Sequence, residues 1–151
     1  MKPIQIFNAL KNKPFGKFLF SKAVCFQAPY FSSIKPKVNQ LQKNLCEVSI
    51  NDKRRVRNHL GTVHAIAMCN MAELSAGMMT DVSIPKGARW IPSSMTVNYV
   101  KKAKGKLTAT ADGSAIDWNI AGTKEVPVSV KNQAGEEVFN ARISMNVKLA
   151  A

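Results

Sequence analysis

The chain has 151 residues, of which 46% are hydrophobic and 21% are charged. This size suits one domain over residues 1–151, and the composition excludes a disordered tail, a collagen-like repeat and a disulfide scaffold. Lys and Arg total 22 against 9 Asp and Glu, which gives a net charge of +13, and no acidic residue precedes Glu47.

The cysteines and the N-terminus bear on where the protein works. Cys25, Cys46 and Cys69 are an odd number without C-x-x-C spacing, which indicates free thiols in a reducing compartment. Lysines interrupt the apolar residues near the N-terminus, so no signal-peptide stretch is predicted. We therefore expect a cytoplasmic protein.

The first half of the chain begins with a basic, apolar segment. Residues 1–28 are predicted to form an N-terminal helical segment that is broken at Pro14-Phe15-Gly16. Alternating residues then predict strands over 37–42 and 45–50, followed by a polar and basic loop over 51–62.

A long central helix is predicted over residues 63–80. This segment has no Lys, Arg or Pro and is rich in Ala and Met, which are good helix formers. Its apolar residues cover every face, so we expect the helix to be buried on most sides, with Thr62 as its N-cap. The length would also cross a membrane, but His64, Asn70 and Glu73 would then lie in lipid, so no membrane partner is expected.

The second half of the chain alternates between apolar and polar residues, as antiparallel strands do. After a loop bracketed by Pro85 and Pro92, strands are predicted over 94–102, 106–111, 114–120, 125–131 and 137–149. One apolar helix among strands buries its surface most simply inside a curled sheet. The sequence therefore predicts an α+β fold with an antiparallel sheet wrapped around one long central helix.

Glu73 is the only Asp, Glu, Lys or Arg between Asn58 and Thr80. A carboxylate on a buried helix must be paired, protonated or facing a wet cleft. Two interpretations stay open: a structural bond to a backbone amide or a lysine, or a reactive group that acts as a base or nucleophile.

The segment that leads into the helix suits an anion. Free amides at a helix start, with an amide side chain such as that of Asn58, would stabilise the oxyanion of an attacked thioester. His64 and Glu73 are nine residues apart, about 13.5 Å along the axis, whereas a reacting carbonyl needs both groups within about 3.5 Å. The chemistry therefore predicts a homodimer in which two antiparallel helices share each site.

Asn58, His64 and Glu73 have the spacing of a known motif. It resembles that of the hotdog-fold thioesterases, in particular the acyl-CoA thioesterases of the phenylacetic-acid-pathway type, whose segment runs Asn, five residues, His-Gly-Gly, and an acidic residue nine positions after the His. The order of elements over residues 30–149 also fits. The resemblance implies a hotdog homodimer, alone or paired into a tetramer, that hydrolyses acyl-CoA.

The same resemblance assigns roles to residues. It implies Glu73 as base or nucleophile, Asn58 and the amide near Ala65 as the groups that orient water or the carbonyl, and His64 in support. Ala65-Ile66 stands in place of the Gly-Gly pair, and Gly61, earlier in the loop, is a partial substitute. The replaced glycines motivate an alternative function: a non-catalytic hotdog module that binds acyl-CoA or another lipidic ligand.

Basic residues form two clusters, at Lys53–Arg57 and at Lys101–Lys106. Such charge attracts nucleic acid, anionic lipid or the phosphates of CoA. We expect Lys101 and Lys102, with Gly61 and Ala65, to contact an acyl-CoA. No nucleic-acid-binding signature is present, so nucleic acid is not the expected partner, and the histidine spacing predicts neither a metal site nor a cofactor.

Overall fold

The computed structural model describes residues 2–150, so the two terminal residues of the expected 1–151 domain lie outside it. Six strands form one antiparallel sheet in the order β1-β2-β4-β5-β6-β3. The strands are β1 (Lys37–Gln42), β2 (Leu45–Ile50), β3 (Arg89–Tyr99), β4 (Leu107–Asp112), β5 (Gly122–Lys131) and β6 (Glu137–Lys148). The helices are α1 (Pro3–Leu10), α2 (Gly16–Gln27) and α3 (Ala65–Ser83), with 3-10 turns η1 (Pro29–Ile34) and η2 (Arg54–Val56).

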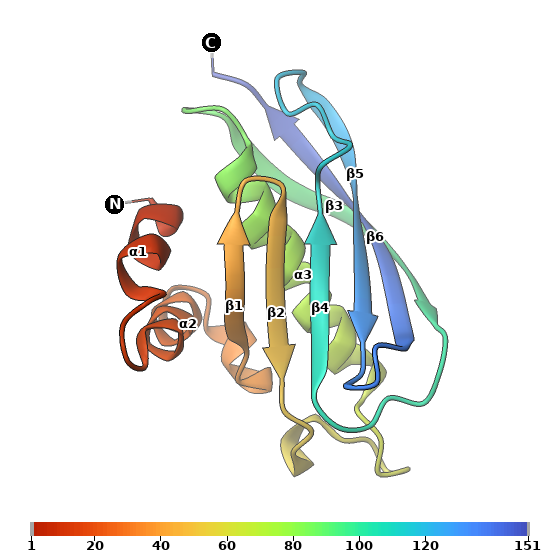
Figure 1. Cartoon of the computed structure of the whole chain (residues 1–151). Helices are drawn as coiled ribbons and strands as arrows, with labels where there is room; N and C mark the ends of the chain where they lie inside the picture. The colour runs from red at the N-terminus through yellow and green to blue at the C-terminus, as the bar shows by residue number, and fades with distance from the viewer. Residues whose placement is uncertain (1, 151) are drawn as a thin grey trace.

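The sheet curls around α3, while α1 and α2 lie beside β1 (Figure 1). The expected α+β hotdog architecture is therefore confirmed. The predicted break between the two N-terminal helices is also confirmed, because Phe15 turns the chain in a left-handed conformation (φ 56°) just before α2. None of the helices within residues 2–150 has the length and apolarity needed to cross a membrane.

Two strand predictions were wrong. Residues 114–120 form turns rather than a strand, with the carboxylates of Asp112 and Asp117 accepting backbone N–H groups two residues ahead. The strand predicted from residue 94 begins at Arg89, because β3 pairs with β6 from Arg89 through an irregularity after Pro92. Proline on this strand is tolerated at a sheet edge.

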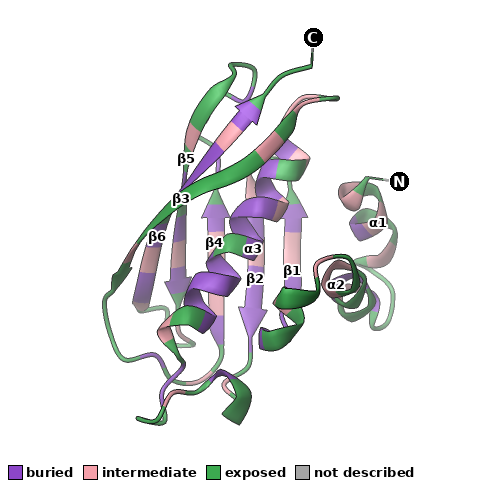
Figure 2. Cartoon of the chain, turned by 180° about the vertical axis from the view of Figure 1, so that it is seen from behind, coloured by how far each residue is buried: buried purple, intermediate pink, exposed green. Residues whose placement is uncertain are grey.

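The central helix begins and ends two to three residues later than predicted, at Ala65 and Ser83. Its N-cap is His64, whose Nδ1 accepts the Ile66 N–H at 3.0 Å, and the prediction of Thr62 was wrong. The Thr62 hydroxyl is engaged elsewhere, at 2.9 Å from the Asn58 amide nitrogen. Most of α3 is buried, as the apolar residues on its every face indicate (Figure 2).

The N-terminal helices attach to the rest of the fold through the inner face of α2. The Phe20 ring is 2% exposed and meets the Phe7 ring edge-on, with the ring centroids 5.1 Å apart. The Ser21 hydroxyl accepts the Val38 N–H at 2.9 Å, which joins α2 to β1. The opposite face of α2 has no such contacts, and the Phe26 side chain there is 89% exposed.

Asp52 holds together the loops at the end of the sheet where α3 begins. Its carboxylate accepts the Arg57 Nε–H at 2.6 Å and the Gly105 N–H at 2.9 Å. A backbone bond from Val63 N–H to the Ala103 carbonyl (2.8 Å) adds a second link between the same loops. The hydrogen bond from Arg57 is the main cause that holds the pKa of Asp52 below its usual range, and the Gly105 N–H acts in the same direction.

Two phenylalanines on α2 provide a matched test of this attachment. Phe20→Ala should lower the free energy of unfolding by about 3–5 kcal/mol, because it opens a cavity in the buried face. Phe26→Ala should change it by no more than about 0.5 kcal/mol, because that ring lies in solvent. Denaturant unfolding measures both values, and equal losses would contradict the packing described.

The Asp52 clamp predicts a pH dependence. Asp52→Asn should lower the free energy of unfolding by about 1–3 kcal/mol near neutral pH, since it removes charged hydrogen bonds. Because the folded pKa lies below the unfolded one, the wild-type advantage is complete above the usual aspartate range, about pH 3.9, and is lost as the pH falls through the folded value. Unfolding series at several pH values measure this, and a pH-independent difference would contradict it.

Candidate functional site

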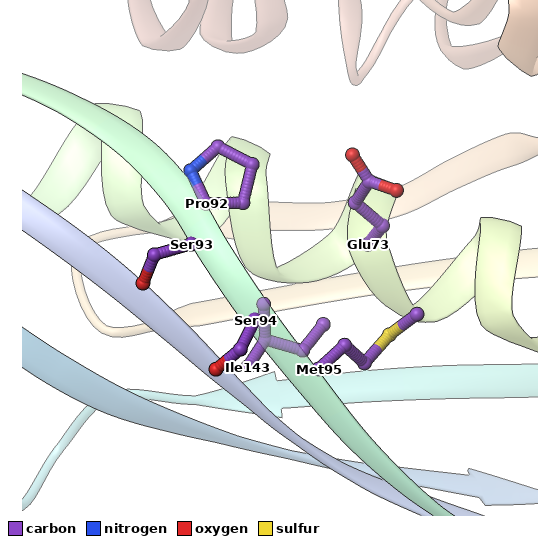
Figure 3. Close-up of a pocket in the computed structure, with 6 residues that line it drawn as sticks. All are labelled: Glu73, Pro92, Ser93, Ser94, Met95 and Ile143. Atoms are coloured by element: carbon purple, nitrogen blue, oxygen red, sulfur yellow. The ribbon is translucent and has the colours of Figure 1, made fainter.

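Glu73 is exposed, although most of the residues of α3 are buried. It lines a cavity of about 190 Å³ together with Pro92, Ser93, Ser94, Met95 and Ile143 (Figure 3). No hydrogen bond or ion pair to its carboxylate is found among residues 2–150. A carboxylate on this helix was expected to be paired, protonated or facing a cleft, and in the structure the Glu73 side chain faces a cleft.

The nearby serines do not satisfy this carboxylate. The Ser93 hydroxyl donates to the Ser144 carbonyl at 3.2 Å, and the Ser94 hydroxyl donates to the Ser144 hydroxyl at 2.8 Å. Both serine hydroxyls therefore point toward β6 and away from Glu73 (Figure 3). The carboxylate remains free to accept a proton or a hydrogen bond from a ligand.

A second cavity, of about 470 Å³, also has Glu73 on its wall. It lies between α3, the N-terminal helices and the start of β3, and its lining is mostly apolar. The other lining residues are Pro3, Ile6, Phe20, Ala23, Val24, Gln27, Ala28, Phe31, Leu74, Gly77, Met78, Asp81, Trp90 and Pro92. This volume and lining are typical of a small-molecule site. Glu73 is thus shared by both cavities.

Trp90 and Gly77 shape the larger cavity. A Cβ atom at Gly77 would lie 2.9 Å from the Trp90 ring, so only glycine lets the indole lie this close to α3. The Trp90 Nε1–H donates to Asp81 at 3.4 Å, which holds the ring beside the helix. This cavity does not follow from the sequence. The helical spacing of Phe20, Val24 and Gln27 was a signal for an inner face of α2, but not for what that face would line.

The loop before α3 is organised by Asn58. Its Oδ1 accepts the N–H groups of Leu60 (3.0 Å) and Thr62 (3.1 Å), and its Nδ2 donates to the Thr62 hydroxyl (2.9 Å). Gly61 supplies the left-handed conformation (φ 72°) that closes this turn. Because an amide nitrogen carries two N–H groups, one donor of Asn58 is left for a ligand.

The first turn of α3 has one backbone donor to offer. The Ile66 N–H is taken by His64 Nδ1, and the Ala67 N–H bonds to the His64 carbonyl. No acceptor for the Ala65 N–H is found among residues 2–150. Since Nδ1 accepts, a neutral His64 ring carries its proton on Nε2 and presents a further donor. The Ile66 side chain is 54% exposed, so it does not cover the Ala65 N–H at the start of the helix.

The predicted residues fall into two groups within one chain. Asn58, Gly61, His64 and Ala65 lie together at the start of α3, and the loop that carries Lys101 and Lys102 is joined to them through the Val63–Ala103 bond. Both lysines are exposed, and Lys101 Nζ forms an ion pair with Glu136 at 2.9 Å.

Glu73 does not join this group. It lies nine residues further along the helix than His64, which places it about 13.5 Å away along the axis.

β3 is the edge of the sheet nearest Glu73, and its outer side is unpaired. Within residues 2–150 it pairs only with β6, and all of its residues are exposed or half-buried (Figure 2). Ile91, Met95 and Tyr99 are 64%, 37% and 55% exposed. A long edge strand with apolar side chains is a template for pairing with another chain.

The thiols do not contribute a reactive group to this site. All three cysteines are unpaired, and burial raises the pKa values of the Cys46 and Cys25 thiols. Cys69 is buried, with its Sγ 3.8 Å from the Tyr99 hydroxyl. Within residues 2–150, no three His, Cys, Asp or Glu side chains gather where they could hold a metal ion.

Solved structures with the same fold include thioesterases. A structural-genomics protein is 46% identical, with a TM-score of 0.89 over 98% of this chain and 99% of that one. A thioesterase from Haemophilus influenzae is 13% identical (TM-score 0.71, covering 80% and 82%), and a thioesterase variant from Pseudomonas aeruginosa is 15% identical (TM-score 0.73, covering 84% and 90%). No curated protein matches the chain.

A family model described as a domain of unknown function, DUF4442, matches residues 16–147. The match covers most of the chain, including α2, α3 and all six strands. The chain therefore belongs to the DUF4442 family, and its fold is the hotdog fold that these two thioesterase structures also have.

Proposed function

We propose that this protein is an acyl-CoA thioesterase whose two sites are completed across a homodimer. The observation that carries the proposal is the Glu73 carboxylate, which has no partner among residues 2–150 and lies on the walls of both cavities. A structural carboxylate on a buried helix would have a partner. A general base or a nucleophile needs to be free and next to its substrate.

The dimer follows from the edge strand. Pairing the outer edges of two β3 strands across a two-fold axis would cover the exposed Ile91 and Met95 side chains. The same axis makes the two α3 helices antiparallel. The start of one helix then approaches Glu73 of the other, which closes the gap of about 13.5 Å that separates the two groups in one chain.

Each group then has a role in thioester hydrolysis. Glu73 removes a proton from water as the water oxygen attacks the carbonyl carbon, or its own carboxylate attacks and water opens the resulting anhydride. The Ala65 N–H and the free Asn58 amide donor of the second copy stabilise the oxyanion, with His64 in support. The carbon–sulfur bond breaks, CoA leaves as a thiolate that takes up a proton, and the acyl group is released as a carboxylate.

The two ends of the substrate find different surroundings. The acyl group suits the apolar cavity of about 470 Å³ behind Glu73. The CoA phosphates suit the cationic loops at the start of the second copy's α3, where Lys101 and Lys102 lie. Cationic loops on one side of the Glu73 carboxylate and an apolar cavity on the other suit a ligand with an anionic end and an apolar end.

Replacing Glu73 tests the chemistry directly. Glu73→Gln should lower kcat for acyl-CoA hydrolysis by about 100-fold or more with little change in KM, because the amide binds alike but neither takes a proton nor attacks. Glu47→Gln is the matched control, since Glu47 is a half-buried carboxylate on β2 that lines neither cavity, and it should keep most of the activity. A thiol-release assay over acyl-CoAs of several chain lengths measures both, and unchanged turnover in Glu73→Gln would exclude the assignment.

One observation favours the second candidate, a module that binds acyl-CoA or another lipidic ligand without cleaving it. Ala65-Ile66 replaces the glycine pair, and His64 already occupies the Ile66 N–H, so the first turn offers only one free backbone donor. Micromolar binding of acyl-CoA by calorimetry, without thiol release by the wild-type protein, would favour this candidate over the enzyme.

A further inference from the structure

The outer face of α2 is apolar although it is not covered by the fold. Phe15, Phe18, Leu19 and Phe26 are spaced i, i+3, i+4 and i+11, which places them on one side of the helix. Their side chains are 82%, 52%, 54% and 89% exposed. We call these four residues the outer stripe. Tyr30, just after the helix, is also exposed, at 71%.

The outer stripe is not explained by the packing of α2. The opposite side of this helix supplies Phe20 to the core and several residues to the large cavity, so α2 is apolar on two opposite faces. A cluster of exposed large apolar side chains is typical of a surface that contacts a partner or a membrane. The outer stripe has this character.

Lysines surround the outer stripe. Lys22 lies within it, with Nζ 5.6 Å from the centroid of the Phe18 ring, and Lys11, Lys13 and Lys17 lie in and just before the same helix. No acidic residue precedes Glu47 in the sequence. The segment thus combines large apolar side chains with positive charge and has no acidic residue of its own.

This combination decides between the surfaces that could cover the stripe. A second copy docked across a two-fold axis would bring the same lysines against each other, and like charges in an interface are costly. The β3 edge, at the opposite end of the strand order, is also free for the homodimer. An anionic lipid surface matches both properties, because aromatic rings enter the headgroup region while lysine stems extend to the phosphates.

We propose that the outer stripe of α2 docks the protein on an anionic lipid membrane. The helix lies in the plane of the headgroups with Phe15, Phe18 and Phe26 inserted. The inner face of the same helix lines the cavity of about 470 Å³, so one helix diameter, about 10 Å, separates that cavity from the lipid. If the proposed function holds, docking places the acyl cavity beside the membrane in which acyl chains reside; the docking itself does not depend on catalysis.

Vesicle flotation with the full chain tests the proposal. The protein should float with phosphatidylcholine vesicles that contain about 30% phosphatidylglycerol, bind pure phosphatidylcholine more weakly, and dissociate as salt is raised. Phe18→Ser with Phe26→Ser should weaken binding by about tenfold or more. Leu60→Ser is the matched control, because Leu60 is 65% exposed on the loop before α3, and it should bind like the wild type.

Charge variants and light scattering complete the test. Lys13→Glu with Lys17→Glu should also weaken binding to the anionic vesicles, and it decides the question if the phenylalanine variants do not fold. Wild-type binding by the variants, equal binding to neutral vesicles, or no binding by the wild type would each overturn the proposal. A loss of oligomeric mass in the phenylalanine variant would identify the stripe as a contact between copies and also overturn it. Glu73→Gln should bind vesicles like the wild type. Vesicle binding therefore tests membrane docking independently of whether the protein is a thioesterase.

Discussion

The structure depends on the burial of α3 in the curl of a single antiparallel sheet. Met71 and Met79 on this helix are fully buried, and each such side chain contributes about 1.5–3 kcal/mol of hydrophobic stabilisation. The sheet covers only one side of the helix, however. On the other side, η1 packs against the helix, whereas α1 and α2 stand off from it and line the larger cavity, so Glu73 and the two cavities are left open.

This incomplete cover explains why an apolar helix can carry one carboxylate. Glu73 is exposed where the two cavities meet, so its carboxylate contacts water rather than the core. The neighbouring hydroxyl groups do not donate to it, since Ser93 and Ser94 bond to Ser144 on β6. The fold thus leaves a carboxyl group without a hydrogen-bond partner among residues 2–150, between an apolar cavity and an unpaired strand edge.

Local patterns predicted most of the fold. The alternation in β6, which buries Phe139, Ile143 and Met145, follows from period 2, and the apolar central helix follows from its Ala and Met content. One error came from pairing between residues far apart in the sequence, and another from a local side-chain hydrogen bond. The start of β3 is set by its pairing with β6, and the cap of α3 passes to His64 because Thr62 bonds to Asn58.

The site was predictable only in part, because some of it depends on how α2 packs against the rest of the fold. Spacing along one helix was enough to show that His64 and Glu73 are too far apart to act on one carbonyl within a chain. Spacing could not show which face of α2 is buried, because two opposite faces of this helix are apolar. Neither the cavity that Phe20 lines nor the exposure of Phe26 therefore followed from the sequence.

The central claim is that each site takes Glu73 from one copy and the start of α3 from the other. Mixing two inactive proteins tests it: Glu73→Gln, and Asn58→Asp, in which the carboxylate still accepts the Leu60 and Thr62 N–H groups but offers no donor to an oxyanion. After the two are unfolded and refolded together, half of the dimers are mixed and have one intact site, so about a quarter of the wild-type activity should return. A mixture that stays as inactive as its two components would contradict the shared site.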